Sequence, residues 1–198
     1  MIKLIIFDVG GVIIHFNDEL YKHDITKRFG ISYSALSKVI DPLLSEMDVG
    51  GASLAQLESA MHKKFGLSKK DLAWNETYQK IARVDYKMIS LIRRLSKRYK
   101  IAMLTNTCRS RYVYSLNRFI DKDIFHGRFA SCYLRMRKPD KQIFDHVISM
   151  MGCGPDEALF IDNMKTNING AVKAGIKGVL FTDQEKLLKD LKRLGIKA

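Results

Sequence analysis

Residues 5–14, IIFDVGGVII, predict a buried strand that ends in a carboxylate. The apolar run is interrupted by Asp8, which is followed by Val9 and two glycines. Ligands of open parallel sheets bind beyond the carboxyl ends of the strands, which is where Asp8 would stand. A lone Asp after a strand is more often a helix cap or a turn residue than a catalytic group. The rest of the chain therefore has to supply partners for it.

The second half of the chain alternates short apolar runs with helical patterns, which favours an α/β fold with a parallel sheet. Together with the first strand at 3–8, the predicted strands are 100–105, 128–134, 157–162 and 178–182. The predicted helices are 85–99, 140–152, 166–175 and 183–195. Asp85 is suited to cap the first of these helices, and Gly152 and Gly175 are suited to end the second and third.

Residues 15–82 contain no convincing strand and instead predict a helical insertion. Four helix-like segments are separated or interrupted by Gly30, Pro42, Gly51 and Gly66. These segments are 18–30, 33–44, 53–66 and 69–82. We therefore expect a discontinuous core made of 1–14 and 83–198, with a helical cap at 15–82. The aromatic residues of this segment, Phe16, Trp74 and Tyr78 among them, are expected mainly to pack a small helical bundle.

The composition is that of a water-soluble globular protein, with 46% hydrophobic and 28% charged residues among 198. No run reaches the roughly 18 apolar residues of a membrane span, and the apolar N-terminus lacks a cleavage site, so we expect a cytoplasmic protein without a membrane partner. Three cysteines without C-x-x-C spacing indicate neither a disulfide framework nor a zinc site. The net charge of +13 is spread over helix faces, and without a recognisable motif it does not predict specific nucleic-acid binding.

Polar side chains follow several of the predicted strands. Asp8 has Thr105, Asn106, Asp162 and Asn163 as counterparts at the ends of two other strands. Lys138 lies before Pro139 in a loop that precedes a helix. Because parallel strands end at the same edge of a sheet, we expect these groups to converge on one site.

Four segments in this order resemble the four motifs of the haloacid dehalogenase-like hydrolases. They are FDVGGVI, LTNT, RKPDKQIF and FIDNMKTNINGAVKAG. The first is similar to the Asp-x-Gly-Gly-Val or Asp-x-Gly-Asn-Val motif of a branch that includes sugar-phosphate phosphatases. The resemblance covers essentially the whole chain, since residues 15–82 stand where that family carries a small cap. It implies a Rossmann-like three-layer core with a parallel sheet and an inserted α-helical cap.

The resemblance also implies a Mg²⁺-dependent phosphohydrolase acting on a small phosphorylated metabolite. Asp8 matches the nucleophile that forms an aspartyl-phosphate. Thr105 and Asn106 match the residues that bind the phosphoryl oxygens, and Lys138 matches the cation that orients the nucleophile and offsets charge on the transferring group. The implied Mg²⁺ ligands are Asp8, the Gly10 carbonyl, Asp162 and Asn163.

The sequence departs from the family pattern at three positions. Gly10 stands where most phosphatases of the family have a second Asp that moves a proton, a role worth about 10² to 10⁴ in rate. A leaving group that needs little protonation, such as an anomeric hydroxyl, a phenolate or an acyl phosphate, is therefore expected. Asn163 replaces a more usual acidic ligand, so weaker metal binding is expected. Arg135 stands where the branch often has Gly, and it could either hold an anionic substrate or obstruct one.

Two other functions remain open. Gly10 and Asn163 are also compatible with a binding or regulatory module that keeps the fold without catalysis. A 2-haloacid dehalogenase would use the same nucleophile without metal or a second Asp. We rank it lowest, because the FID and GGV segments resemble the phosphatases.

Overall fold

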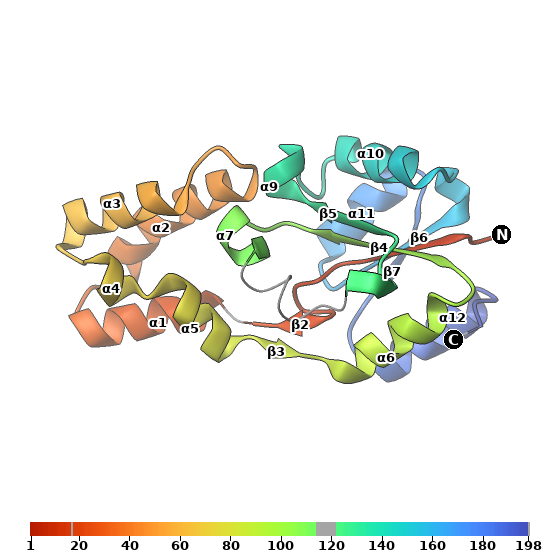
Figure 1. The fold of residues 1–198 in the computed structure, drawn as a ribbon, viewed down its shortest axis with the longest axis horizontal. Helices are drawn as coiled ribbons and strands as arrows, with labels where there is room; N and C mark the ends of the chain where they lie inside the picture. Colours follow the sequence, from red (N-terminus) through yellow and green to blue (C-terminus); the bar gives the residue numbers. More distant parts are fainter. Residues whose placement is uncertain (17, 114–121, 198) are drawn as a thin grey trace.

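A five-stranded parallel sheet with the order β5-β4-β1-β6-β7 forms the centre of the protein (Figure 1). The computed structural model describes residues 1–16, 18–113 and 122–197. The strands are β1 (Leu4–Phe7), β4 (Lys100–Thr105), β5 (Gly127–Ala130), β6 (Ala158–Asp162) and β7 (Lys177–Leu180). The four residues of β1 are fully buried, because β1 has neighbouring strands on both sides and helices on both faces.

Two helices cover each face of the sheet, as the resemblance implies. Ile5 and Phe7 point to the face covered by α6 (Tyr86–Leu95) and α12 (Gln184–Arg193). Leu4 and Ile6 point to the opposite face, covered by α10 (Lys141–Met151) and α11 (Lys165–Lys173). The alternation follows from the two-residue repeat of a strand. The α/β fold with a three-layer core is therefore confirmed.

Most predicted elements of the core are present, with one correction. Asp85 caps α6 by accepting a hydrogen bond from the Met88 amide, and Gly152 ends α10 in a left-handed conformation. The predicted strand 128–134 was wrong in its second half, where Ser131–Leu134 form the helical turn α9. Strand β4 ends at Thr105, opposite Ala130, so β5 has no partner beyond that point. The remaining short core helices are α7 (Arg109–Arg111), η2 (Lys122–Ile124) and η3 (Pro155–Glu157).

The insertion is a group of helices with a hydrophobic core of its own, located beyond the carboxyl ends of the strands (Figure 1). Its helices are α1 (Asp18–Phe29), α2 (Tyr33–Asp48), α3 (Leu54–Phe65), α4 (Lys69–Leu72) and α5 (Trp74–Ile81). Pro42 lies inside α2 and does not end it, because a proline removes only one backbone hydrogen bond from a helix stabilised by the burial of Leu36, Ile40 and Met47.

The two chain crossings between core and insertion run side by side. Strand β2 (Ile14–His15) pairs antiparallel with β3 (Arg83–Val84), so the expectation of no strand in 15–82 was wrong at His15. A two-residue strand is too short to show a periodic pattern in the sequence. This pair coincides with the boundaries expected for the cap, and the division into two domains there stays a prediction.

A glycine allows the insertion to pack on the core. Gly50, after α2, has a φ of +70°, and a Cβ built on it would lie 2.5 Å from the carbonyl oxygen of Cys132 in α9. Gly30 has a similar φ of +66° but open space around it.

We expect Gly50→Ala to lower the free energy of unfolding by about 2 to 5 kcal/mol and Gly30→Ala by only about 1 to 2 kcal/mol. Both variants pay for a left-handed alanine, whereas only the first also overlaps a backbone atom. Urea denaturation of the two variants provides the measurement. Equal losses would show that the Gly50 contact does not hold the insertion.

Candidate active site

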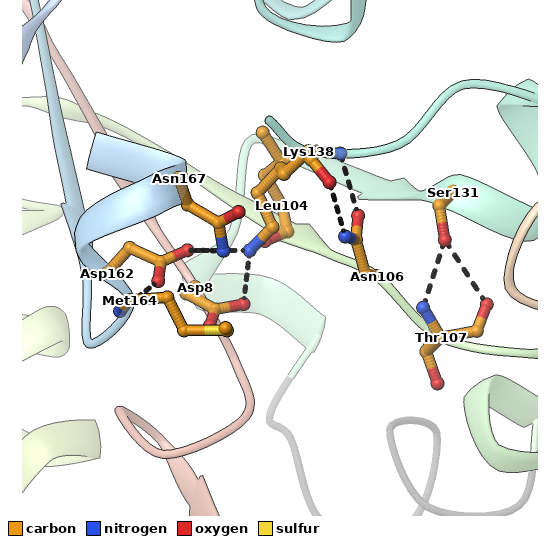
Figure 2. A network of polar contacts seen from close by, with 9 residues as sticks. All are labelled: Asp8, Leu104, Asn106, Thr107, Ser131, Lys138, Asp162, Met164 and Asn167. Atoms are coloured by element: carbon orange, nitrogen blue, oxygen red, sulfur yellow. Dashed lines mark hydrogen bonds and ion pairs between the residues drawn. The ribbon is translucent and has the colours of Figure 1, made fainter. Parts of the chain in front are cut away.

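Residues from three predicted motifs meet around the ammonium group of Lys138 (Figure 2). Its Nζ lies 2.6 Å from Oδ1 of Asp8 and 2.8 Å from Oδ2 of Asp162, and it donates a third hydrogen bond to the Leu104 carbonyl at 3.0 Å. Lys138 is 2%, Asp8 6% and Asp162 0% exposed. Three acceptors hold the buried ammonium group in one position. Because Asp8 and Asp162 both bind it, the two carboxylates lie beside each other.

The sheet places the two carboxylates. Phe7 and Ile161 are partners in the parallel ladder between β1 and β6, and the Asp8 amide donates to the Ile161 carbonyl at 2.8 Å. Asp8 and Asp162 consequently leave the sheet at the same edge. Asp162 is fixed further by the Met164 amide, which donates to its Oδ1 at 2.7 Å, and by the Asn167 amide group, which donates to its Oδ2 at 3.0 Å.

The position of Lys138 depends on contacts made by its backbone. The Asn106 side chain accepts a hydrogen bond from the Lys138 amide and donates one to its carbonyl, both at 2.9 Å. On the other side, α11 packs so closely on the loop that a Cβ on Gly170 would overlap the Pro139 carbonyl. Asn106 was expected to contact the substrate. The structure uses its side chain to position Lys138, which leaves the Asn106 backbone amide as the group to offer to a ligand.

Burial governs the ionisation of Asp8. Desolvation raises the pKa of the Asp8 carboxyl from 3.8 to about 6, and the nearby charge of Asp162 acts in the same direction. Lys138 opposes this rise through its charge and its hydrogen bond. A carboxylate that is charged but poorly solvated is more reactive toward an electrophile than one surrounded by water, provided that a cation keeps it ionised.

The oxygen atoms at this edge of the sheet suit a hard divalent cation. Asp8 and Asp162 are close enough to share one ammonium group, and carboxylate, carbonyl and amide oxygens are the ligands that Mg²⁺ prefers. Asn163 lies over the turn after Asp8, where a Cβ on Gly11 would overlap its amide group. Among the residues that the structure describes, no cluster of three or more His, Cys, Asp or Glu side chains forms a metal site. Two carboxylates and neutral oxygens are a donor set that fits Mg²⁺.

A cavity of about 520 Å³ opens at these groups. Thr105, at the end of β4, lines it together with Asp8, Gly10 and Lys138. Phe16 and Tyr78 also line it, although they belong to the segment whose aromatics were expected mainly to pack a bundle. Other aromatics, such as Tyr21 and Trp74, do pack in the core of the insertion.

Arg135 does not line the Asp8 cavity. It caps α9 with a positive φ of 55° and lines a separate cavity of about 650 Å³ between α9 and the loop after α2. Arg137 does line the Asp8 cavity, and its guanidinium donates to Ser45 of the insertion at 2.8 Å.

Two buried polar residues of the site were missed in the sequence. Asn167 lies five residues after Asp162, inside the fourth motif. It is in the first turn of α11, which begins just after Asp162, and this closeness in the sequence could have indicated the contact. Ser131 is fully buried, and its Oγ accepts from the Thr107 amide at 3.0 Å, which holds the loop after β4. Ser131 gave no signal, because its contact depends on the helical turn that replaces the end of the predicted strand.

Comparison with known proteins identifies the family. The family model for haloacid dehalogenase-like hydrolases matches residues 2–175. The chain belongs to this family. The resemblance seen in the four motifs is therefore confirmed, and this haloacid dehalogenase-like hydrolase is an enzyme.

Relatives of the hydrolase include phosphatases. Sesquiterpene phosphatase astK from Aspergillus oryzae is 25% identical over 197 residues, covering 97% of this chain and 96% of its own. D-ribitol-5-phosphate phosphatase from Bacteroides thetaiotaomicron is 27% identical over 194 residues, 89% of this chain and 90% of its own. A crystal structure of the HAD family enzyme bt-2542 from Bacteroides thetaiotaomicron, in complex with magnesium and inorganic phosphate, has a TM-score of 0.82 and 21% identity, with 94% and 99% of the two chains covered.

Across the described ranges, the hydrolase has no helix that is long and apolar enough to cross a bilayer.

Proposed function

We propose that the enzyme is a Mg²⁺-dependent phosphohydrolase that acts on a small phosphorylated metabolite through an aspartyl-phosphate at Asp8. The observation that carries the proposal is the Asp8 carboxylate held by Lys138 at 2.6 Å on the wall of the 520 Å³ cavity. The phosphatase names of two relatives that align with most of the chain support it.

The residues have complementary roles in this proposal. An Asp8 oxygen attacks phosphorus, and the bond from phosphorus to the leaving oxygen breaks. Lys138 keeps Asp8 ionised and offsets charge on the phosphoryl oxygens, which accept hydrogen bonds from the Thr105 hydroxyl and the Asn106 amide. Water then hydrolyses the aspartyl-phosphate and restores the carboxylate. Mg²⁺, held by Asp8, Asp162, the Gly10 carbonyl and Asn163, would screen the repulsion between the nucleophile and the phosphate dianion.

The Gly10 position shapes the expected substrates. No carboxylic acid at residue 10 can protonate the leaving oxygen, so this enzyme should favour esters whose leaving group is stable as an anion. Phosphate release from a panel of sugar phosphates, aryl phosphates and acyl phosphates tests the proposal. Halide release from a 2-haloacid without phosphate release from any ester would instead establish a dehalogenase.

We expect chelation of divalent cations to abolish phosphate release and added Mg²⁺ to restore it. Asn163→Asp should lower the Mg²⁺ concentration needed for half-maximal activity by about three- to tenfold, because a charged oxygen replaces a neutral one at the same size. Calorimetric titration with Mg²⁺ gives the affinity independently of turnover. Asn75→Asp, at a half-buried position that does not line the Asp8 cavity, is a control for an added charge. Unchanged Mg²⁺ affinity in Asn163→Asp would remove Asn163 from the ligand set.

A further inference from the structure

Two aromatic rings form one wall of the Asp8 cavity. Phe16 follows β2 in the first crossing from core to insertion, and Tyr78 lies on α5 just before the second crossing. Their ring centroids are 5.1 Å apart with an interplanar angle of 61°, and both residues line the cavity. The Arg111 guanidinium lies over both rings, 5.7 Å from Phe16 and 5.2 Å from Tyr78. Arg111, on α7, therefore contacts both rings from the core.

The Phe16 ring stands next to the position of the missing acid. A Cβ built on Gly10 would lie 3.3 Å from Cε1 and 3.4 Å from Cζ of Phe16. The φ of Gly10 is not in the left-handed region, so the backbone conformation does not exclude a side chain there. The Phe16 ring is the group that such a side chain would contact. The space in which a proton donor would face the leaving group is therefore bordered by an apolar surface.

We propose that the wall of Phe16 and Tyr78 receives the leaving group, and that the substrate is a phosphomonoester of a flat aromatic or conjugated hydroxyl compound. This inference rests on the proposed phosphohydrolase function. A ring of the substrate stacks on Phe16 or meets its edge, as aromatic pairs do at centroid distances of about 4.5 to 7 Å. The P–O bond breaks with its electron pair on the leaving oxygen, the resulting phenolate or enolate is stabilised by conjugation, and solvent protonates it after departure.

The first experiment separates aromatic contact from acidity of the leaving group. We compare kcat/KM for an aryl phosphate and for a fluorinated alkyl phosphate whose alcohol has the same pKa as the phenol. The wild-type enzyme should favour the aryl ester by about two- to tenfold, which is the contribution of one aromatic contact. Phe16→Leu should remove this preference mainly through KM, and Phe16→Tyr should keep it.

Phe65→Leu is the matched control, because Phe65 is an aromatic of the insertion that packs in its own core. Thermal unfolding of each variant shows whether the fold is retained. An equal rate for the two esters in the wild-type enzyme, or a preference that survives in Phe16→Leu, overturns the inference. If Asp8→Asn hydrolyses neither the aryl nor the alkyl ester, the phosphohydrolase proposal is still supported. The two proposals can therefore fail separately.

The second experiment concerns the pairing of Gly10 with Phe16. Gly10→Asp alone should raise the rate for a simple alkyl phosphate by less than about threefold, because the Phe16 ring crowds the new side chain. The double change Gly10→Asp with Phe16→Ala should raise the alkyl rate by about tenfold or more over Phe16→Ala alone, since a proton donor then reaches the leaving oxygen. A large gain in Gly10→Asp alone would show that Phe16 does not border the proton position.

Discussion

Asp8→Asn is expected to reduce phosphate release by about 10⁴-fold or more, because the amide cannot form the acyl-phosphate bond. The stability of the fold should not decrease. Burial raises the pKa of the Asp8 carboxyl from 3.8 to about 6, so at neutral pH the ionised carboxylate is less favourable in the folded protein than in the unfolded chain. The neutral amide avoids that cost, and Lys138 keeps its partner Asp162 at 2.8 Å. The thermal midpoint of the variant in metal-free buffer should therefore equal or exceed that of the wild type.

The matched control is Asp140→Asn, at an exposed carboxylate two residues after Lys138 that makes no capping hydrogen bond to α10. It should leave both the rate and the midpoint close to those of the wild type. Trapping of phosphorylated protein after acid quenching gives a direct measurement of the intermediate. Phosphate release that persisted in Asp8→Asn at a comparable rate would exclude Asp8 as the nucleophile.

Lys138→Met should strongly destabilise the fold. It leaves Asp8 and Asp162 buried side by side without their shared cation, which costs about 3 to 5 kcal/mol. The rate should fall by at least about 10²- to 10³-fold because charge on the phosphoryl group is no longer offset. Lys141→Met, whose exposed ion pair with Asp145 contributes at most about 1 kcal/mol, is the control.

The pH dependence of this variant has a definite sign. Removal of Lys138 takes away the interactions that lower the pKa of Asp8, so the pKa rises further above 3.8. The folded state then holds more protons than the unfolded state between pH 4 and the raised pKa, and the free energy of unfolding falls as pH rises through that range. Urea denaturation of Lys138→Met and wild type in metal-free buffer from pH 4 to 8 measures the difference. Parallel curves would mean that Lys138 does not control the charge of Asp8.

The sequence was sufficient to predict which groups meet, for a simple physical reason. Parallel strands end at one edge, so carboxylates that follow β1 and β6 must be neighbours once the strands are paired. Lys138 was expected at the same edge, but its loop has no periodicity to place it, and only the family resemblance gave it a role beside Asp8. The role of the Asn106 side chain in positioning Lys138 could not be predicted, because it bonds to the backbone of a loop residue 32 positions away.

The aromatic wall was harder still to predict. Phe16 and Tyr78 have the pattern of packing residues within the insertion, and their position at the cavity depends on how the insertion sits on the core. That position is set by contacts such as Gly50 against Cys132, which involve the tertiary approach of two backbones. Local sequence carries no information about such an approach. The β2–β3 pair was not predicted for a related reason. Each strand has only two residues, and its partner lies about 70 residues away in the sequence.

The β2–β3 pair also bears on how this enzyme could have diversified. Ile14 and Val84 are ladder partners, so the chain leaves the core and returns to it at points separated by about 5 Å, the spacing of one strand pair. A segment with its two ends that close can be lengthened, shortened or exchanged for another without rethreading the sheet. Under the proposed function, exchange of this segment is expected to change substrate choice, while the phosphoryl chemistry stays with the strand ends. The same architecture invites grafting: insertions from related enzymes, joined at residues 14 and 84, are candidates for transferring leaving-group preference onto this core.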